Sequence, residues 1–249
     1  MESGAQSASN GVSYRTVREL GKRSLRSFAA VREPHELVVA QRFVRPRGGS
    51  ATPEGATTLD AEALALLLRD ARCLAKSWHL NIGRVRHADL SPAGELTIAS
   101  ELIDGATLGD LVLAAAPDRT SPRDPQLPIP VLVRILLDVL AGLSALHGLL
   151  DGMNVPLGAI HGELCPANVV VGRDGVARIV NVLRPRPVRL AAGSEAIGYA
   201  APETSDGTDD PRSDIYAVGV MLWEGSSGEG SSTRPSPHAC SRDSARTSS

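Results

Sequence analysis

The sequence predicts an α+β fold, with a β-rich N-terminal part and a mainly helical C-terminal part. Residues 14–20, 28–31 and 37–43 are expected to form strands, and the second and third of these segments contain short apolar runs separated by polar residues. Residues 130–146 instead place apolar side chains at helical spacing. With 249 residues and a hydrophobic content of 42%, the chain can bury a sizeable core, which we expect to be arranged as two lobes.

The remaining elements follow in chain order. Residues 59–74 have the periodicity of an amphipathic helix, and residues 96–102 have that of a strand. Residues 169–180 contain two apolar runs around a Gly-Arg-Asp-Gly turn, which is typical of a hairpin. A last helix is predicted for residues 214–223. The stretches 45–57 and 116–130 contain Pro and Gly and are predicted to be connectors.

A polar segment just before the hairpin carries the clearest functional signal. It reads His161-Gly162-Glu163-Leu164-Cys165-Pro166-Ala167-Asn168. This is the spacing of the H-R-D-x-x-x-x-N catalytic loop, in which the Asp accepts the substrate proton and the Asn holds a magnesium ion. An Ala-Pro-Glu triplet at residues 201–203 and the predicted helix with Asp214 follow in the same order. Residues 14–224 therefore resemble the bacterial eukaryotic-type (Hanks-type) Ser/Thr protein kinases, in a degenerate form.

The resemblance implies a protein-kinase-like, two-lobed fold with a β-rich N-lobe and a mainly helical C-lobe. We expect a flexible leader at 1–13, the N-lobe at 14–103, a partial C-lobe at 104–224 and a disordered tail at 225–249. The tail is rich in Ser, Gly, Pro and Arg, which cannot bury enough apolar surface to offset chain entropy. Because the family has further helices at this point, we expect a C-lobe truncated after the central helix. Asp214 matches the aspartate that braces the catalytic loop in the family.

The positions that would bind ATP are altered. By resemblance they are Gly21 in the glycine-rich loop, Gln41 at the lysine, Asp70 at the helix glutamate, and Glu101 with Ile103 at the hinge. Gln41 is neutral and cannot neutralise phosphate oxygens or form the ion pair with the helix carboxylate. Of the loop glycines that let backbone N–H groups approach phosphates, only Gly21 remains. We expect any binding of ATP to be weak.

The catalytic and metal positions are altered as well. Glu163 stands at the catalytic Asp and could still act as a base, but its extra methylene displaces the carboxylate, and about 1 Å of misplacement can cost about a hundredfold in rate. Gly162 replaces the arginine of the loop, and His161 is expected to be structural. Asn168 and Asn181 are the candidate metal ligands, but Asn181 replaces a carboxylate with a neutral amide. Mg²⁺ binding is therefore expected to be weak.

These changes favour a pseudokinase that acts as a regulatory or protein-binding module, with no firmly expected cofactor. One alternative is a weak ATP-dependent Ser/Thr kinase that uses Glu163 as base and Asn168 with Asn181 for the metal. A second alternative is a non-functional product of a truncated kinase gene. The sequence leaves both alternatives open, and it does not identify a substrate, a partner or an oligomeric state.

Composition excludes several other classes of function. The 26 basic and 28 acidic residues give no bulk electrostatic attraction to nucleic acid or to an anionic membrane. Residues 1–13 lack the apolar core of a signal peptide, and charges at Arg134 and Asp138 interrupt the longest apolar run, so no membrane span of about 18 to 20 residues is expected. The three cysteines are scattered, without metal-site spacing. We expect a cytoplasmic protein that binds another protein.

Overall fold

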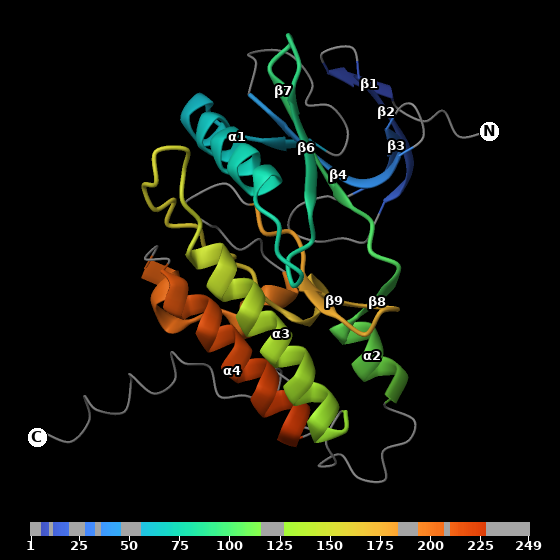
Figure 1. The fold of residues 1–249 in the computed structure, drawn as a ribbon, viewed down its shortest axis with the longest axis vertical. Helices are drawn as coiled ribbons and strands as arrows, with labels where there is room; N and C mark the ends of the chain where they lie inside the picture. The colour runs from blue at the N-terminus through green and yellow to red at the C-terminus, as the bar shows by residue number, and fades with distance from the viewer. Residues whose placement is uncertain are drawn as a thin grey trace, which may run out of the picture.

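The structure is a computed structural model of the chain. It describes residues 6–9, 12–19, 28–32, 36–45, 56–115, 127–183, 194–206 and 210–227. Two lobes are stacked along the long axis, with a sheet and one helix in the upper lobe and mostly helices in the lower lobe (Figure 1). The predicted α+β, two-lobed architecture is therefore confirmed.

A twisted, mostly antiparallel sheet forms the N-lobe. Its strand order is β1-β2-β3-β4-β7-β6, and β5 pairs in parallel with β4. The strands are β1 (Gln6–Ser9), β2 (Val12–Glu19), β3 (Phe28–Arg32), β4 (Glu36–Val44), β5 (Ala56–Thr58), β6 (Val85–Leu90) and β7 (Glu95–Glu101).

One face of this sheet is covered by α1 (Ala61–Lys76) (Figure 1). The helix begins at Asp60, whose side chain accepts a hydrogen bond from the backbone N–H of Ala63 at 2.8 Å and so caps a helix donor. Its buried apolar face belongs to the same core as Phe43 of β4, so the helical periodicity of the sequence reports a real packing face.

Two boundaries of the predicted N-lobe were wrong. The leader expected at residues 1–13 contains β1, which pairs with β2, and β2 itself begins at Val12. The connector expected at 45–57 contains the start of β5. Both strands are short and polar, and they are defined by backbone hydrogen bonds to a neighbour, so no apolar alternation marked them in the sequence.

Within its described residues, the C-lobe combines a small sheet with three α-helices. The sheet has the order β10-β9-β8. Its elements are β8 (Gly105–Thr107), β9 (Val169–Gly172) and β10 (Ala177–Ile179), and the helices are α2 (Leu108–Ala115), α3 (Ile129–His147) and α4 (Pro211–Ser227). The 3₁₀ turns among the described residues of this lobe are η2 (Pro166–Asn168), η3 (Glu195–Tyr199) and η4 (Pro202–Asp206). The predicted hairpin at 169–180 is confirmed as β9 and β10.

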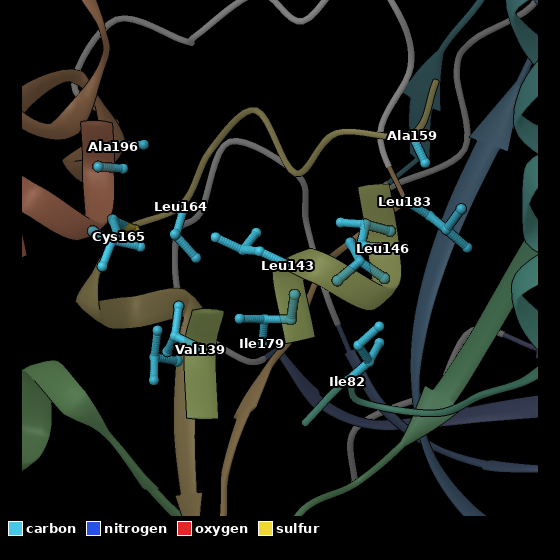
Figure 2. Packing of buried hydrophobic residues seen from close by; sticks show 14 of the residues in the cluster. Ile82, Val139, Leu143, Leu146, Ala159, Leu164, Cys165, Ile179, Leu183 and Ala196 are labelled. Atoms are coloured by element: carbon cyan, nitrogen blue, oxygen red, sulfur yellow. The ribbon is translucent and has the colours of Figure 1, made fainter. Parts of the chain in front are cut away.

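The long helix α3 is the centre of the C-lobe core. Figure 2 shows Val139, Leu143 and Leu146 of this helix beside Ile179 of β10 and Ile82, and all five are buried in one cluster. Such burial of large aliphatic side chains contributes about 1.5–3 kcal/mol each.

Within the described residues, α3 is one helix that could cross a membrane by length and composition alone, with a mean hydropathy of 2.1. This differs from the expectation that Arg134 and Asp138 would interrupt the apolar run. The two charges pair with each other at 3.0 Å, and Asp138 also accepts the backbone N–H of Ala177 at 3.1 Å. Almost half of the apolar window (44%) is buried, so we read α3 as a core helix of the lobe.

The last described helix extends beyond the predicted end of the C-lobe. α4 continues to Ser227, and Gly225 is buried so closely against Leu132 of α3 that a Cβ at Gly225 would lie 2.5 Å from a Leu132 methyl. The tail predicted to begin at residue 225 therefore begins with packed helix, because glycine permits this close helix contact. The rest of the predicted tail, 228–249, lies outside the described residues.

A short segment after α1 joins the two lobes. The backbone carbonyl of Asn81 accepts the N–H of Ile179 at 2.9 Å, and its side-chain amide donates to the carbonyl of Ala177 at 3.0 Å. The N–H of Gly83 donates to the carbonyl of Ile179 at 2.8 Å. On the other side, α3 approaches so closely at Gly142 that a Cβ there would lie 2.6 Å from the Asn81 carbonyl oxygen.

Candidate functional site

A buried carboxylate of the C-lobe holds the loop at residues 161–168. Asp214 of α4 is 2% exposed, and its two oxygens accept the backbone N–H groups of His161 at 2.8 Å and Gly162 at 2.9 Å. The imidazole of His147 lies 2.8 Å from the same carboxylate. The expectation that Asp214 braces the loop is confirmed.

This environment favours the charged form of Asp214. Burial raises its pKa, but the hydrogen bonds from His147 and from the backbone N–H groups of His161 and Gly162 lower the pKa by more, so that it lies below the ordinary value. The carboxylate is therefore ionised at neutral pH, and it holds the start of the loop through charge-assisted hydrogen bonds.

His161 is a structural residue, as expected. The side chain is fully buried, and its Nδ1 accepts the backbone N–H of Glu163 at 3.3 Å. The Nε2 lies 3.0 Å from the carbonyl oxygen of Val180, to which it donates because Nδ1 is the acceptor. Gly162, between these residues, has φ +73°, a conformation that side chains resist, which explains why glycine suits this position.

Three neutral amides meet at the front of the loop, facing the N-lobe. The Nε2 of Gln41 donates to Asn181 Oδ1 at 3.3 Å, and the Nδ2 of Asn181 donates to Asn168 Oδ1 at 2.9 Å. The Nδ2 of Asn168 then donates to the backbone carbonyl of Glu163 at 2.7 Å. We call Gln41, Asn181 and Asn168 the amide chain. The structure thus brings together three residues that the sequence placed at the lysine and metal positions.

The amide chain does not fit a magnesium ion. Mg²⁺ favours anionic oxygens in near-ideal octahedral geometry, whereas the side-chain oxygens of Asn168 and Asn181 are neutral and each already accepts an N–H. Within the part of the chain that the structure describes, no group of three or more His, Cys, Asp or Glu side chains could hold a metal ion. We therefore derive no chemical step through a metal here.

Glu163 is present in the loop but is not well placed as a base. The residue is only 4% exposed, and it is not among those that line the cavity at the hinge described below. A general base must reach the substrate hydroxyl directly or through one water. The burial of Glu163 therefore argues against the catalytic role that the spacing suggested.

Asp70 and Gln41 line different cavities. The Oδ1 of Asp70 accepts two hydrogen bonds from its neighbour Arg69, at 2.8 and 2.9 Å. Asp70 lines a small cavity with Leu146 and Leu183, whereas Gln41 lines the cavity at the hinge. An ion pair is impossible in any case because Gln41 carries no charge.

An open cavity of about 280 Å³ lies between the lobes, next to the hinge. Its apolar lining comes from Val39, Val85, Ile98, Val170, Val180 and Leu183. Glu101 and Ile103 line it as predicted, and the Glu101 carboxylate accepts the N–H of Arg84 at 3.0 Å. Gly21 lies outside the described residues, so its predicted role at the cavity is not addressed by the structure.

Sequence reasoning missed two polar residues at the mouth of this cavity. Thr107 and Asp110 both line it, and they cap the start of α2 reciprocally. The Thr107 hydroxyl donates to the Asp110 carboxylate at 2.6 Å and accepts the Asp110 N–H at 3.0 Å. The signal was available, because Thr-x-x-Asp before an apolar run is the spacing of a capping box.

The sequence is similar to those of known bacterial protein kinases, over half or more of the chain. No protein-family model matches the sequence. PknL, a Ser/Thr protein kinase of Mycobacterium tuberculosis, is 31% identical over 134 residues, which cover 51% of this chain and 29% of PknL. PknB of Lactococcus lactis, described as a probable Ser/Thr protein kinase, is 24% identical over 222 residues, 85% of this chain and 31% of PknB.

The chain is thus similar in sequence to bacterial Ser/Thr protein kinases. Its fold is that of the kinase domain of M. tuberculosis PknI, to whose crystal structure it aligns with a TM-score of 0.59 and 22% identity, over 92% of this chain and 78% of the other. The chain spans under a third of the length of PknL and PknB.

Proposed function

We propose that the chain is a pseudokinase, a kinase-like module in the cytoplasm that binds or regulates another protein without transferring phosphate. The amide chain is the observation that carries this proposal. Its support is that three neutral side chains, linked by two hydrogen bonds, stand at the positions that by resemblance would hold the phosphates and the metal, whereas phosphoryl transfer requires charged groups there.

Phosphoryl transfer depends almost entirely on positioning and on charge stabilisation. With Gln41 at the lysine position, the positive charge that offsets phosphate oxygens is missing. With Asn181 in place of a carboxylate, the second Mg²⁺ ligand is neutral. Because the remaining candidate base, Glu163, is buried, all three contributions to catalysis are weakened at once.

A binding role is supported by the surface of the C-lobe. Ile215, Leu222 and Trp223 of α4 are 47%, 43% and 36% exposed, and Ile215 and Leu222 lie on the same side of the helix because they are seven residues, about two turns, apart. Exposed apolar groups of this kind mark surfaces for protein association. The nearly balanced charge favours a protein partner over nucleic acid or a membrane surface.

The proposal is tested by thermal unfolding with and without excess ATP and Mg²⁺. We expect no shift of the midpoint for the natural chain. The double variant Gln41→Lys/Asn181→Asp restores the two charges. We expect its thermal midpoint to rise by about 5–10 °C when the concentration of ATP is 100 times the dissociation constant. The control is Gln41→Met, which removes one amide without supplying a charge and should not respond.

A phosphorylation assay with γ-labelled ATP completes the test. Turnover by the natural chain that disappears in Glu163→Ala would contradict the pseudokinase proposal and establish a weak Ser/Thr kinase instead. A chain without any cooperative unfolding transition would support the alternative of a non-functional gene product.

A further inference from the structure

The face of the N-lobe sheet opposite α1 contains a buried arginine. Side chains alternate along β4, so that Gln41 and Phe43 face the cleft and α1, whereas Ala40 and Arg42 point to the other side. There Ala40 belongs to a second small core with Tyr14, which is distinct from the main core of the molecule.

This side of the sheet is strongly curved. The hydroxyl of Tyr14 on β2 donates to the carboxylate of Asp89 on β6 at 2.6 Å, although β3, β4 and β7 lie between these strands in the sheet. Such a bond is possible only where the sheet curls over itself. As a result Arg42 is 7% exposed and Thr97, directly opposite it on β7, is 0% exposed.

The partners of Arg42 are neutral. One terminal nitrogen donates to the Thr16 hydroxyl at 2.9 Å, and the guanidinium lies 5.7 Å from the centre of the Phe28 ring. Its Nε has no hydrogen-bond partner, and Arg42 forms no ion pair within the part of the chain that the structure describes. The Nε of Arg32 also has no hydrogen-bond partner, but Arg32 differs from Arg42 in having a carboxylate nearby, since its Nη1 lies 3.9 Å from Glu36.

A second unpaired polar atom lies across the strands from Arg42. Thr97 is its register partner on β7, and the Thr97 hydroxyl has no hydrogen-bond partner either. The nearest acidic residue in register is Asp89, on the far side of Thr97, and its carboxylate is bound to Tyr14. Two buried donors, one of them charged, thus occupy facing positions.

A buried charge without a counter-ion is strongly destabilising, and a buried donor without a hydrogen-bond partner destabilises the fold as well. We propose that a small inorganic anion of the chloride type binds between the Nε of Arg42 and the hydroxyl of Thr97. A water molecule would satisfy the hydrogen bonds but would leave the positive charge uncompensated. The complete burial of Thr97 favours a small ion over an extended organic acid.

The test is anion-dependent unfolding of the full chain. Thermal midpoints are measured in sodium chloride and in sodium methanesulfonate at matched ionic strength, so that general screening is equal. We expect a saturable rise of about 5–10 °C at a chloride concentration of 100 times the dissociation constant. The rise should vanish in Arg42→Met and decrease in Thr97→Val. The matched control is Arg32→Met, on a cation that already has a carboxylate, which should keep the rise.

Equal midpoints in the two salts, or a chloride effect that persists in Arg42→Met, would refute the site. If Arg42→Met does not fold, crystals of the natural chain grown in sodium bromide decide the question. An anomalous bromide peak between Arg42 and Thr97 would support the proposal, and its absence would overturn it. These outcomes do not depend on nucleotide binding or catalysis, so they are separate from the tests of the proposed function.

Discussion

The loop at residues 161–168 has two sides that differ in their chemistry. The side facing α4 is held by an ionised, buried carboxylate, with Asp214 accepting from His161 and Gly162. The side facing the N-lobe carries only neutral amides, linked from Gln41 to Asn168. Polar groups on both sides of the loop therefore have hydrogen-bond partners.

This difference separates what the fold requires from what the chemistry requires. The Asp214 carboxylate positions the loop relative to the C-lobe core, and it retains its charge although that charge is buried. The positions that would bind phosphate and metal can lose their charges without leaving unsatisfied groups, because the amides pair with one another. Stability and catalysis therefore depend on different sides of the same loop.

The largest effect is expected at Asp214. We expect Asp214→Ala to lower the free energy of unfolding by about 3–5 kcal/mol, because the substitution leaves two buried N–H groups and His147 without their acceptor. Urea denaturation measures the change. Asp174→Ala is the control, since this surface carboxylate pairs only locally with Arg178, and it should have no measurable effect. Equal losses of unfolding free energy in the two variants would show that the hydrogen bonds of Asp214 do not stabilise the fold.

A smaller effect is expected on the other side of the loop. Asn168→Ala removes the acceptor for Asn181 and the donor to the Glu163 carbonyl, and should cost about 1–3 kcal/mol in the same denaturation experiment. Ser144→Ala, on an exposed face of α3, is the control and should stay within about 0.5 kcal/mol. If Asn168→Ala also left the free energy of unfolding unchanged, the amide chain would not contribute to the stability of the protein.

The smallest expected effect is a dependence of stability on acid. The folded-state pKa of Asp214 is lowered, so its contribution is fully present above its ordinary value of 3.8 and is lost as the pH falls through the lower folded value. Thermal midpoints recorded from pH 6 downwards should therefore decrease more steeply for the natural chain than for Asp214→Asn. Parallel curves for the two proteins would contradict the assignment of a depressed pKa.

Strong periodicity made much of the fold predictable. The predicted helices at 59–74 and 130–146 differ from α1 and α3 by two residues or fewer at each end, since each has a continuous apolar face. Strands β1, β5, β6 and β8 were missed because they are specified by their pairing with neighbours, and β1, β5 and β8 are also short. Their sequences contain no apolar alternation from which a strand could have been predicted.

The candidate site was predictable as a set of positions but not as a set of bonds. Spacing placed Gln41, Asn168 and Asn181 in the cleft, yet the hydrogen bond between Gln41 and Asn181 joins residues 140 positions apart and depends on how the lobes meet. The burial of Glu163 and the turn of Asp70 towards Arg69 depend on packing in the same way. Residue type alone does not determine them.

The segment at Asn81 also limits how the molecule can move. Because its backbone and side chain are bonded to β10, and Gly142 of α3 lies against it, the N-lobe cannot rotate about this point without breaking several buried contacts at once. The amide hydrogens of Ile82, Gly83 and Ile179 should therefore exchange with solvent together, at the rate of global unfolding. A molecule that enters the cleft must fit the width that this rigid joint already sets.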